Sequence, residues 1–220
     1  MSLWIKICGN TSLDDARVAA DAGADALGFV FTPSPRQVTV AQAAAIHKRL
    51  PASVERIGVF VDASMDEIFA TVRGCGLTGV QLHFDIDADF TAGLRARLGP
   101  LLRILRVVHF GPEAAAQLEA IAADENVDAV LVDSRTMAAV GGTGVAYDWN
   151  AARTSLFQNH PAAKPLVAAG GLTPWNVAQA ISTLRPWGVD VASGVEEEPG
   201  HKDHDALRAF IANARAARRG

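Results

Sequence analysis

The sequence predicts a single α/β domain that spans residues 1–220 and folds as a (β/α)8 barrel, or TIM barrel. Short apolar runs, typical of strands buried on both faces, alternate with segments of helical periodicity. Eight such pairs follow one another without a long polar linker, and eight parallel strands close most economically into a barrel. A doubly wound open sheet is the alternative, but the turn after the first predicted strand lacks the GxGxxG fingerprint of that fold.

The eight predicted strands are short and rich in apolar residues. They cover residues 4–8, 26–31, 56–61, 79–83, 102–108, 129–133, 166–169 and 189–192. The strands are separated by helical segments, so we expect all of them to run parallel, with the helices outside.

The predicted helices begin at recognisable capping residues. Ser12 precedes the first helix, with Asp15 three positions later in the capping-box pattern. Thr173 and Pro174 fit the cap and first turn of the seventh helix, and the eighth is expected from about Asp203. The remaining predicted helices cover 40–50, 64–73, 87–98 and 112–122, with another beginning near 148.

The composition is that of an ordinary globular protein rather than a nucleic-acid or membrane protein. Half of the residues are hydrophobic and the net charge is −4, which gives no general attraction to nucleic acid or anionic lipid. No apolar run approaches the roughly 18 residues of a membrane span, and the N-terminus has no leader pattern. Two cysteines fit a reduced, cytoplasmic compartment. The oligomeric state, monomer or homodimer, is left open.

Polar side chains gather where the predicted strands end. Barrels of this type build their sites at the carboxyl ends of the strands. Residues alternate along a strand, so Lys6 and Cys8 share a face. A lysine pointing into the barrel needs a charge partner, for which Asp133 and Asp190 are the two candidates. The other polar residues at this rim are Arg36, Gln81 and His83.

Cys8 has two possible roles. A small buried cysteine is most often a packing residue. Its position at a strand end beside a lysine favours a reactive role, because a nearby positive charge favours the thiolate. Cys75 has no such neighbour in the sequence, and we expect it to be structural.

Glycine-bearing turns follow the sixth, seventh and eighth predicted strands. Phosphate sites in these barrels use the last loops, where exposed backbone N–H groups bind the anion. We therefore expect a phosphorylated small-molecule ligand, held without an arginine or lysine clamp, at Gly142, Thr143, Gly144, Gly170, Gly171, Ser193 and Gly194.

No metal or cofactor is expected. The histidines form no HxH or HxxxH pair. The segment HKDHD at 201–205 is better explained as the start of the last helix, because the helix dipole favours Asp in the first turn. No nucleotide fingerprint or cofactor-lysine motif is present, which favours cofactor-free chemistry.

Several short motifs occur in order along nearly the whole chain. They are KICG (6–9), SPR (34–36), QLH (81–83), Asp133 with GGTG (141–144) and DW (148–149), AGGL (169–172), DV (190–191), SGVE (193–196) and PGHKD (199–203). In this combination the chain resembles the phosphoribosylanthranilate isomerase family of tryptophan biosynthesis.

The resemblance implies an enzyme that converts N-(5-phosphoribosyl)anthranilate to its 1-deoxyribulose 5-phosphate isomer by an Amadori rearrangement, without metal or coenzyme. It implies that Cys8 is the general base and Asp133 the general acid. It also implies that Arg36 holds the anthranilate carboxylate and that the glycine turns hold the phosphate. We expect further substrate contacts from Lys6, Gln81, His83 and Asp190.

Two residues depart from the family pattern. Phe84 stands where glycine usually follows QLH, and Ala192 replaces the more common Ser or Asn. Phe84 could face the anthranilate ring or pack beneath its loop.

The sequence leaves two alternative functions to compare with this one. The histidine-pathway isomerase of the same barrel class has an aspartate where this chain has Cys8. A silent phosphosugar-binding barrel would not need Cys8 and Asp133 together.

Overall fold

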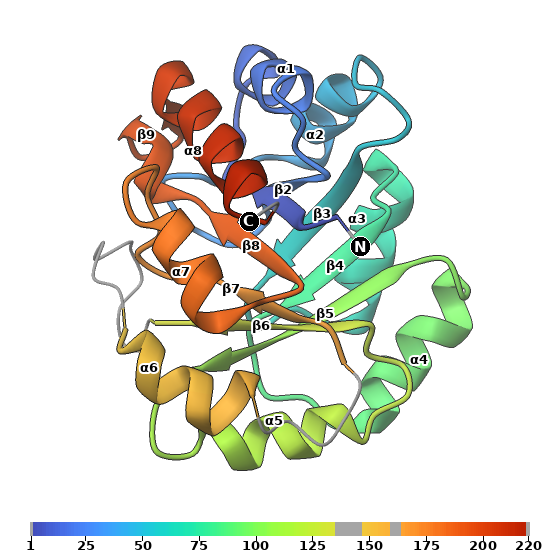
Figure 1. The fold of residues 1–220 in the computed structure, drawn as a ribbon. Coiled ribbons are helices and arrows are strands. Elements are labelled where there is room, and N and C mark those ends of the chain that lie inside the picture. Colours follow the sequence, from blue (N-terminus) through green and yellow to red (C-terminus); the bar gives the residue numbers. More distant parts are fainter. Residues whose placement is uncertain (1, 135–146, 159–163, 219–220) are drawn as a thin grey trace.

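The computed structural model describes residues 2–134, 147–158 and 164–218. Its eight parallel strands follow chain order around a closed barrel, and the last pairs with the first (Figure 1). The predicted (β/α)8 barrel is confirmed. The strands are β1 (Trp4–Ile7), β2 (Ala26–Val30), β3 (Glu55–Phe60), β4 (Gly79–Leu82), β5 (Arg103–His109), β6 (Ala129–Asp133), β7 (Leu166–Ala168) and β8 (Gly188–Val191).

The helices lie around the outside of the barrel (Figure 1). The sixth is short and continues as a π-helix, Arg153–Phe157. The helices are α1 (Leu13–Asp21), α2 (Val40–His47), α3 (Met65–Cys75), α4 (Ala88–Leu98), α5 (Ala114–Ala122), α6 (Trp149–Ala152), α7 (Val177–Leu184) and α8 (His204–Ala217).

Side-chain caps fix the start of most of these helices. The Ser64 hydroxyl accepts from the Glu67 N–H while the Glu67 carboxylate accepts from the Ser64 N–H, which is a complete capping box. Asp203 caps α8 as expected, accepting from the N–H groups of the first turn. Caps of this kind stabilise a helix by about 0.5–2 kcal/mol each.

The predicted start of the first helix is confirmed, and that of the seventh is wrong. Ser12 caps α1 by accepting from the Asp15 N–H, but the reciprocal half of the capping box is missing because the Asp15 carboxylate pairs with His204 of α8 instead. The helix expected from Thr173 begins at Val177 and has Asn176 as its N-cap. The Asn176 side chain accepts from the Thr173 N–H, so 173–176 form a separate turn before the helix.

A small hairpin between the last strand and the last helix was not predicted. It consists of β9 (Glu196–Glu198) and β10 (His201–Lys202), which pair antiparallel. A single 3-10 turn, Ser193–Val195, joins it to β8. The hairpin brings two charged side chains, Glu196 and Lys202, to the carboxyl rim.

The buried apolar side chains form two layers. One layer packs between strands and helices, and a smaller one fills the barrel. Along β1, Ile5 and Ile7 belong to the outer layer and Trp4 to the inner one, so Lys6 and Cys8 have the parity of the interior. None of the helices in the described part of the chain is long and apolar enough to span a bilayer. The inner layer is made of Trp4, Ala26, Ile57, Leu105, Ala129, Leu131, Val167 and Ala169.

Candidate active site

A buried ion pair lies inside the barrel between β1 and β8. Lys6 and Asp190 are register partners on these strands, and Lys6 Nζ donates to Asp190 Oδ1 at 2.8 Å. The lysine is fully buried. Burial alone lowers the pKa of Lys6, but its interactions with Asp190 and Cys8 outweigh burial and raise it above the ordinary value. Of the two carboxylates considered from the sequence, Asp190 is the one that pairs with Lys6.

Cys8 follows β1 at the carboxyl rim as a free thiol with 8% exposure. A Cβ on Gly28, in the neighbouring strand β2, would lie 2.6 Å from Cys8 Sγ and 3.1 Å from Lys6 Cε. The absence of a side chain at Gly28 therefore makes room for the side chains of Cys8 and Lys6. Gly28 could not be singled out from the sequence, because one glycine inside a strand gives no sign of what lies beside it.

Asp133 ends β6 on the face that Leu131 shares with the barrel interior, and its exposure is 1%. Gly170 lies against it, since a Cβ there would be 2.5 Å from Asp133 Oδ1. Tyr147, which was not predicted as a site residue from the sequence, is close enough to interact electrostatically with Asp133. Burial and then the charge of Asp133 raise the pKa of the Tyr147 hydroxyl well above its ordinary value.

Three further polar side chains have the parity of the inward-facing residues of β4 and β5. Gln81 hydrogen-bonds His83 through Nε2 of each side chain. The His83 ring lies 6.2 Å from that of His109, the last residue of β5 and the register partner of Asp133. His109 was not predicted as a site residue from the sequence, and it lies one position beyond the end of the predicted fifth strand, 102–108. The structure brings Gln81 and His83 together as expected, and the His83 ring lies near that of His109, the register partner of Asp133.

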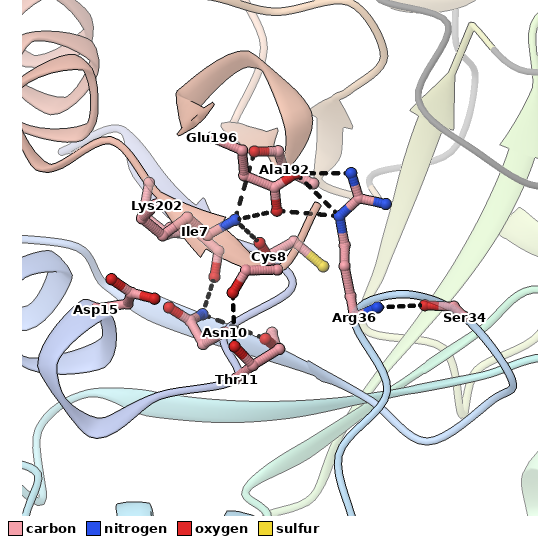
Figure 2. Close-up of polar contacts among 12 residues, drawn as sticks. Ile7, Cys8, Asn10, Thr11, Asp15, Ser34, Arg36, Ala192, Glu196 and Lys202 are labelled. Atoms are coloured by element: carbon pink, nitrogen blue, oxygen red, sulfur yellow. Dashed lines mark hydrogen bonds and ion pairs between the residues drawn. The ribbon is translucent and has the colours of Figure 1, made fainter. Parts of the chain in front are cut away.

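Arg36 enters the rim from the loop after β2 and meets the unexpected hairpin (Figure 2). Its Nε and Nη2 donate to the Glu196 carboxylate, the shortest contact being 2.6 Å. Lys202 Nζ donates to the same carboxylate at 2.8 Å and to the Cys8 carbonyl at 2.6 Å. Figure 2 shows Glu196 between the two cations and the Cys8 sulfur directed toward the side where Arg36 lies.

The charges of this cluster depend on one another. Burial alone would raise the pKa of Glu196, but the hydrogen bonds from Arg36 and the charge of Lys202 lower it below the ordinary value. Burial lowers the pKa of Lys202, and Glu196 opposes that effect only in part. Glu196 is therefore held as a carboxylate between two cations.

The glycine turn after β7 adopts a backbone that only glycine tolerates easily. Gly170 and Gly171 have φ of +80° and +65°. A side chain at Gly194, in the turn after β8, would overlap the carbonyl oxygen of Leu172. The two turns are thus in contact through Gly194 and Leu172. The remaining predicted phosphate residues, Gly142, Thr143 and Gly144, lie outside the described residues.

Two other sequence expectations can be compared with the structure. Phe84 packs edge-to-face on Phe90 of α4, with ring centroids 5.7 Å apart, which supports the packing alternative for this residue. Among the described residues, no group of three or more His, Cys, Asp or Glu is arranged to hold a metal ion.

Groups that can donate and remove protons are thus concentrated at the carboxyl rim, where barrels of this kind carry out their chemistry. The molecule is a (β/α)8-barrel enzyme. Residues 5–213 match the family model of N-(5'phosphoribosyl)anthranilate (PRA) isomerase. The N-(5'-phosphoribosyl)anthranilate isomerase of Roseiflexus castenholzii is 45% identical over 222 residues, covering 98% of this chain and 99% of that protein.

Two of the solved structures that share the fold are phosphoribosylanthranilate isomerases. One is a phosphoribosyl anthranilate isomerase in complex with reduced 1-(o-carboxyphenylamino)-1-deoxyribulose 5-phosphate, with 33% identity and a TM-score of 0.80. The other is a monomeric form of the dimeric enzyme from Thermotoga maritima, with 33% identity and a TM-score of 0.79. Each comparison covers 97% of this chain and 99% of the other. The chain belongs to the N-(5'-phosphoribosyl)anthranilate isomerase family. Its activity is the isomerisation of N-(5'-phosphoribosyl)anthranilate in tryptophan biosynthesis.

Proposed function

We propose that the enzyme performs the Amadori rearrangement with Cys8 as general base and Asp133 as general acid. The observation that carries this proposal is that the two side chains have inward parity at one rim, each beside a glycine that leaves it room. Protonation of the furanose ring oxygen by the acid opens the ring and leaves an imine. The base then removes the C2 proton, and the resulting enolamine relaxes to the ketone.

Arg36 would hold the anthranilate carboxylate. Glu196 accepts from Nε and Nη2, which leaves the edge formed by Nη1 and the second Nη2 hydrogen available. That edge matches a carboxylate in a two-bond arrangement, whereas a lysine in the same place could not. Arg36→Lys is expected to raise KM, and an unchanged kcat/KM in that variant would discard the assignment.

The turns after β7 and β8 would hold the phosphate through backbone N–H groups. The left-handed backbone of Gly170 and Gly171 and the adjoining Ser193–Val195 turn support this assignment. Gly171→Glu is expected to raise KM sharply through steric overlap and like-charge repulsion. If this variant binds substrate as well as the parent enzyme, the phosphate lies elsewhere.

The other inward polar residues would orient the sugar. Lys6, Asp190, Gln81 and His83 lie around the same rim, and the buried Lys6–Asp190 pair supplies a fixed arrangement of charge beneath Cys8. We also expect a reduced, cytoplasmic setting, which the two free cysteines support. Analytical ultracentrifugation would distinguish a monomer from the homodimer known in Thermotoga maritima.

The direct test is turnover of N-(5'-phosphoribosyl)anthranilate, followed through the loss of its fluorescence. The parent enzyme should turn the substrate over, whereas Asp133→Asn should lose about 10²–10⁴-fold in kcat, as is typical for a lost acid. A silent binding barrel would bind the substrate without turnover. Preference for the histidine-pathway substrate would indicate the sister isomerase instead.

A further inference from the structure

The carboxylate of Glu196 is one of the most completely surrounded charges at the rim. Its side chain is 3% exposed and accepts from Arg36 Nε at 3.0 and 3.1 Å and from Arg36 Nη2 at 2.6 Å. Lys202, whose side chain is fully buried, supplies the second cation. Burying a carboxylate so deeply is costly unless it is paired and hydrogen-bonded, and both conditions are met here.

Arg36 is fixed along its whole length. Its backbone N–H donates to Ser34 Oγ at 2.9 Å. Gly9 lies against its aliphatic stem, where a Cβ would be 2.7 Å from Arg36 Cδ. Glu196 then holds the guanidinium by the Nε–Nη2 edge. A long side chain that is flexible in most proteins is therefore ordered before any ligand arrives.

Lys202 joins this arrangement to the strand that bears the thiol. Its Nζ donates to the carbonyl of Cys8 at 2.6 Å and, more weakly, to that of Ala192 at 3.4 Å. The hairpin that carries Glu196 is thereby attached to the ends of β1 and β8 (Figure 2). The position of Glu196 is set by the barrel itself rather than by a free loop.

We propose that Glu196 is a positioning residue that fixes the Arg36 guanidinium with its Nη1–Nη2 edge turned to the anthranilate carboxylate. The proposal rests on the assignment of Arg36 to that carboxylate made above. Glu196 acts through Arg36 and does not touch the substrate. It contributes by ordering the guanidinium in advance, which lowers the entropy cost of binding.

The experiment compares two ligands that differ only in the carboxylate. One is reduced 1-(o-carboxyphenylamino)-1-deoxyribulose 5-phosphate, and the other is the phenylamino analogue without the carboxyl group. Their Kd values are measured by titration calorimetry on the parent enzyme and on Glu196→Gln. We expect Glu196→Gln to reduce the preference for the carboxylated ligand by about 2- to 13-fold, the effect of ordering one long side chain.

Four further variants, one of them a double variant, make the result specific. Glu197→Gln changes the exposed neighbour on the same strand and should leave the preference unaltered. Glu196→Asp keeps the negative charge beside Lys202, but its shorter side chain cannot reach both cations. The preference for the carboxylated ligand should therefore fall in this variant too, which keeps the test decisive if Glu196→Gln does not fold. In Arg36→Lys the preference should be lost, and adding Glu196→Gln should reduce it no further.

Equal weakening of both ligands in Glu196→Gln would overturn the proposal and make Glu196 a purely structural residue. Tighter binding of the carboxylated ligand would also overturn it, because Glu196 would then compete with the substrate for Arg36. If Arg36→Lys itself keeps the preference, the assignment of Arg36 fails. If Arg36→Lys loses the preference and Glu196→Gln keeps it, only the positioning role fails.

Discussion

Replacing Asp190 by Asn should destabilise the barrel strongly, because it removes the carboxylate that pairs with a fully buried lysine. Lys6 has 0% exposure and its Nζ lies 2.8 Å from Asp190 Oδ1. Removing one partner of a buried ion pair costs about 3–5 kcal/mol. In a chain of 220 residues each kcal/mol shifts Tm by about 2–4 °C, so the expected fall is about 6–20 °C.

Far-UV circular dichroism measures both quantities: urea unfolding gives the free energy of unfolding and thermal unfolding gives Tm, with Asp66→Asn as control. Asp66 pairs with Arg97 at 2.6 Å, but its side chain is 86% exposed, so this variant should change stability far less. The double variant Lys6→Met/Asp190→Leu should regain much of the loss. A cost below about 1 kcal/mol for Asp190→Asn would refute the reasoning, since Lys6 would then reach solvent or another partner.

The pair also predicts a pH dependence. The folded-state pKa of Lys6 is raised above 10.5, its ordinary value. A raised lysine pKa means that its contribution to stability is fully present below pH 10.5 and is lost as pH rises through the folded-state value. At high pH the unfolding free energy of the parent enzyme should therefore fall relative to that of the double variant, which lacks the lysine. A constant difference up to the alkaline limit would contradict this.

Three further changes have definite expected outcomes. Phe84→Gly should lower Tm and leave KM unchanged, because the Phe84 ring packs on Phe90 rather than on substrate. The aromatic contact contributes about 0.5–1.5 kcal/mol beyond burial. A raised KM would contradict the packing role. Gly194→Ala should raise KM and lower Tm, because a Cβ there would overlap a backbone oxygen; wild-type kinetics would show that the turn is free to move. Burial lowers the pKa of His47 below 6.5, so the folded state binds fewer protons and stability should fall as pH drops from about 6.5 toward the folded-state value. His47→Gln should flatten that slope in urea titrations, whereas the exposed His201→Gln should not; equal slopes in both variants would exclude His47 as the cause.

Much of the fold could be predicted because its signals are local. Apolar runs of strand length and capping residues such as Ser64 and Asp203 depend on residues within a few positions of each other. The predicted start of α7 at Thr173 was wrong, because these local signals have more than one structural meaning. Thr173 and Pro174 also suit a free-standing turn, and the contact that decides between them comes from the Asn176 side chain.

The site was predictable where strand parity applies and not where distant segments meet. Parity placed Lys6 and Cys8 inside the barrel. Parity could not single out Glu196, because a run of three glutamates is typical of an exposed segment. Glu196 contacts Arg36, which is 160 residues away in the sequence. Tyr147 and His109 likewise become notable only when the folded chain brings them beside Asp133.

The measurement that tests the account most directly is kcat for Cys8→Ser, with Cys75→Ser as the matched control. Serine keeps the size and hydrogen bonding of cysteine but cannot ionise near neutrality. Cys75 is also buried, but it donates to the Thr71 carbonyl, and burial raises its thiol pKa to about 11. We expect Cys8→Ser to lose about 10²–10⁴-fold in kcat with KM nearly unchanged, and Cys75→Ser to retain full activity. Nearly full kcat in Cys8→Ser would contradict the account and require another base.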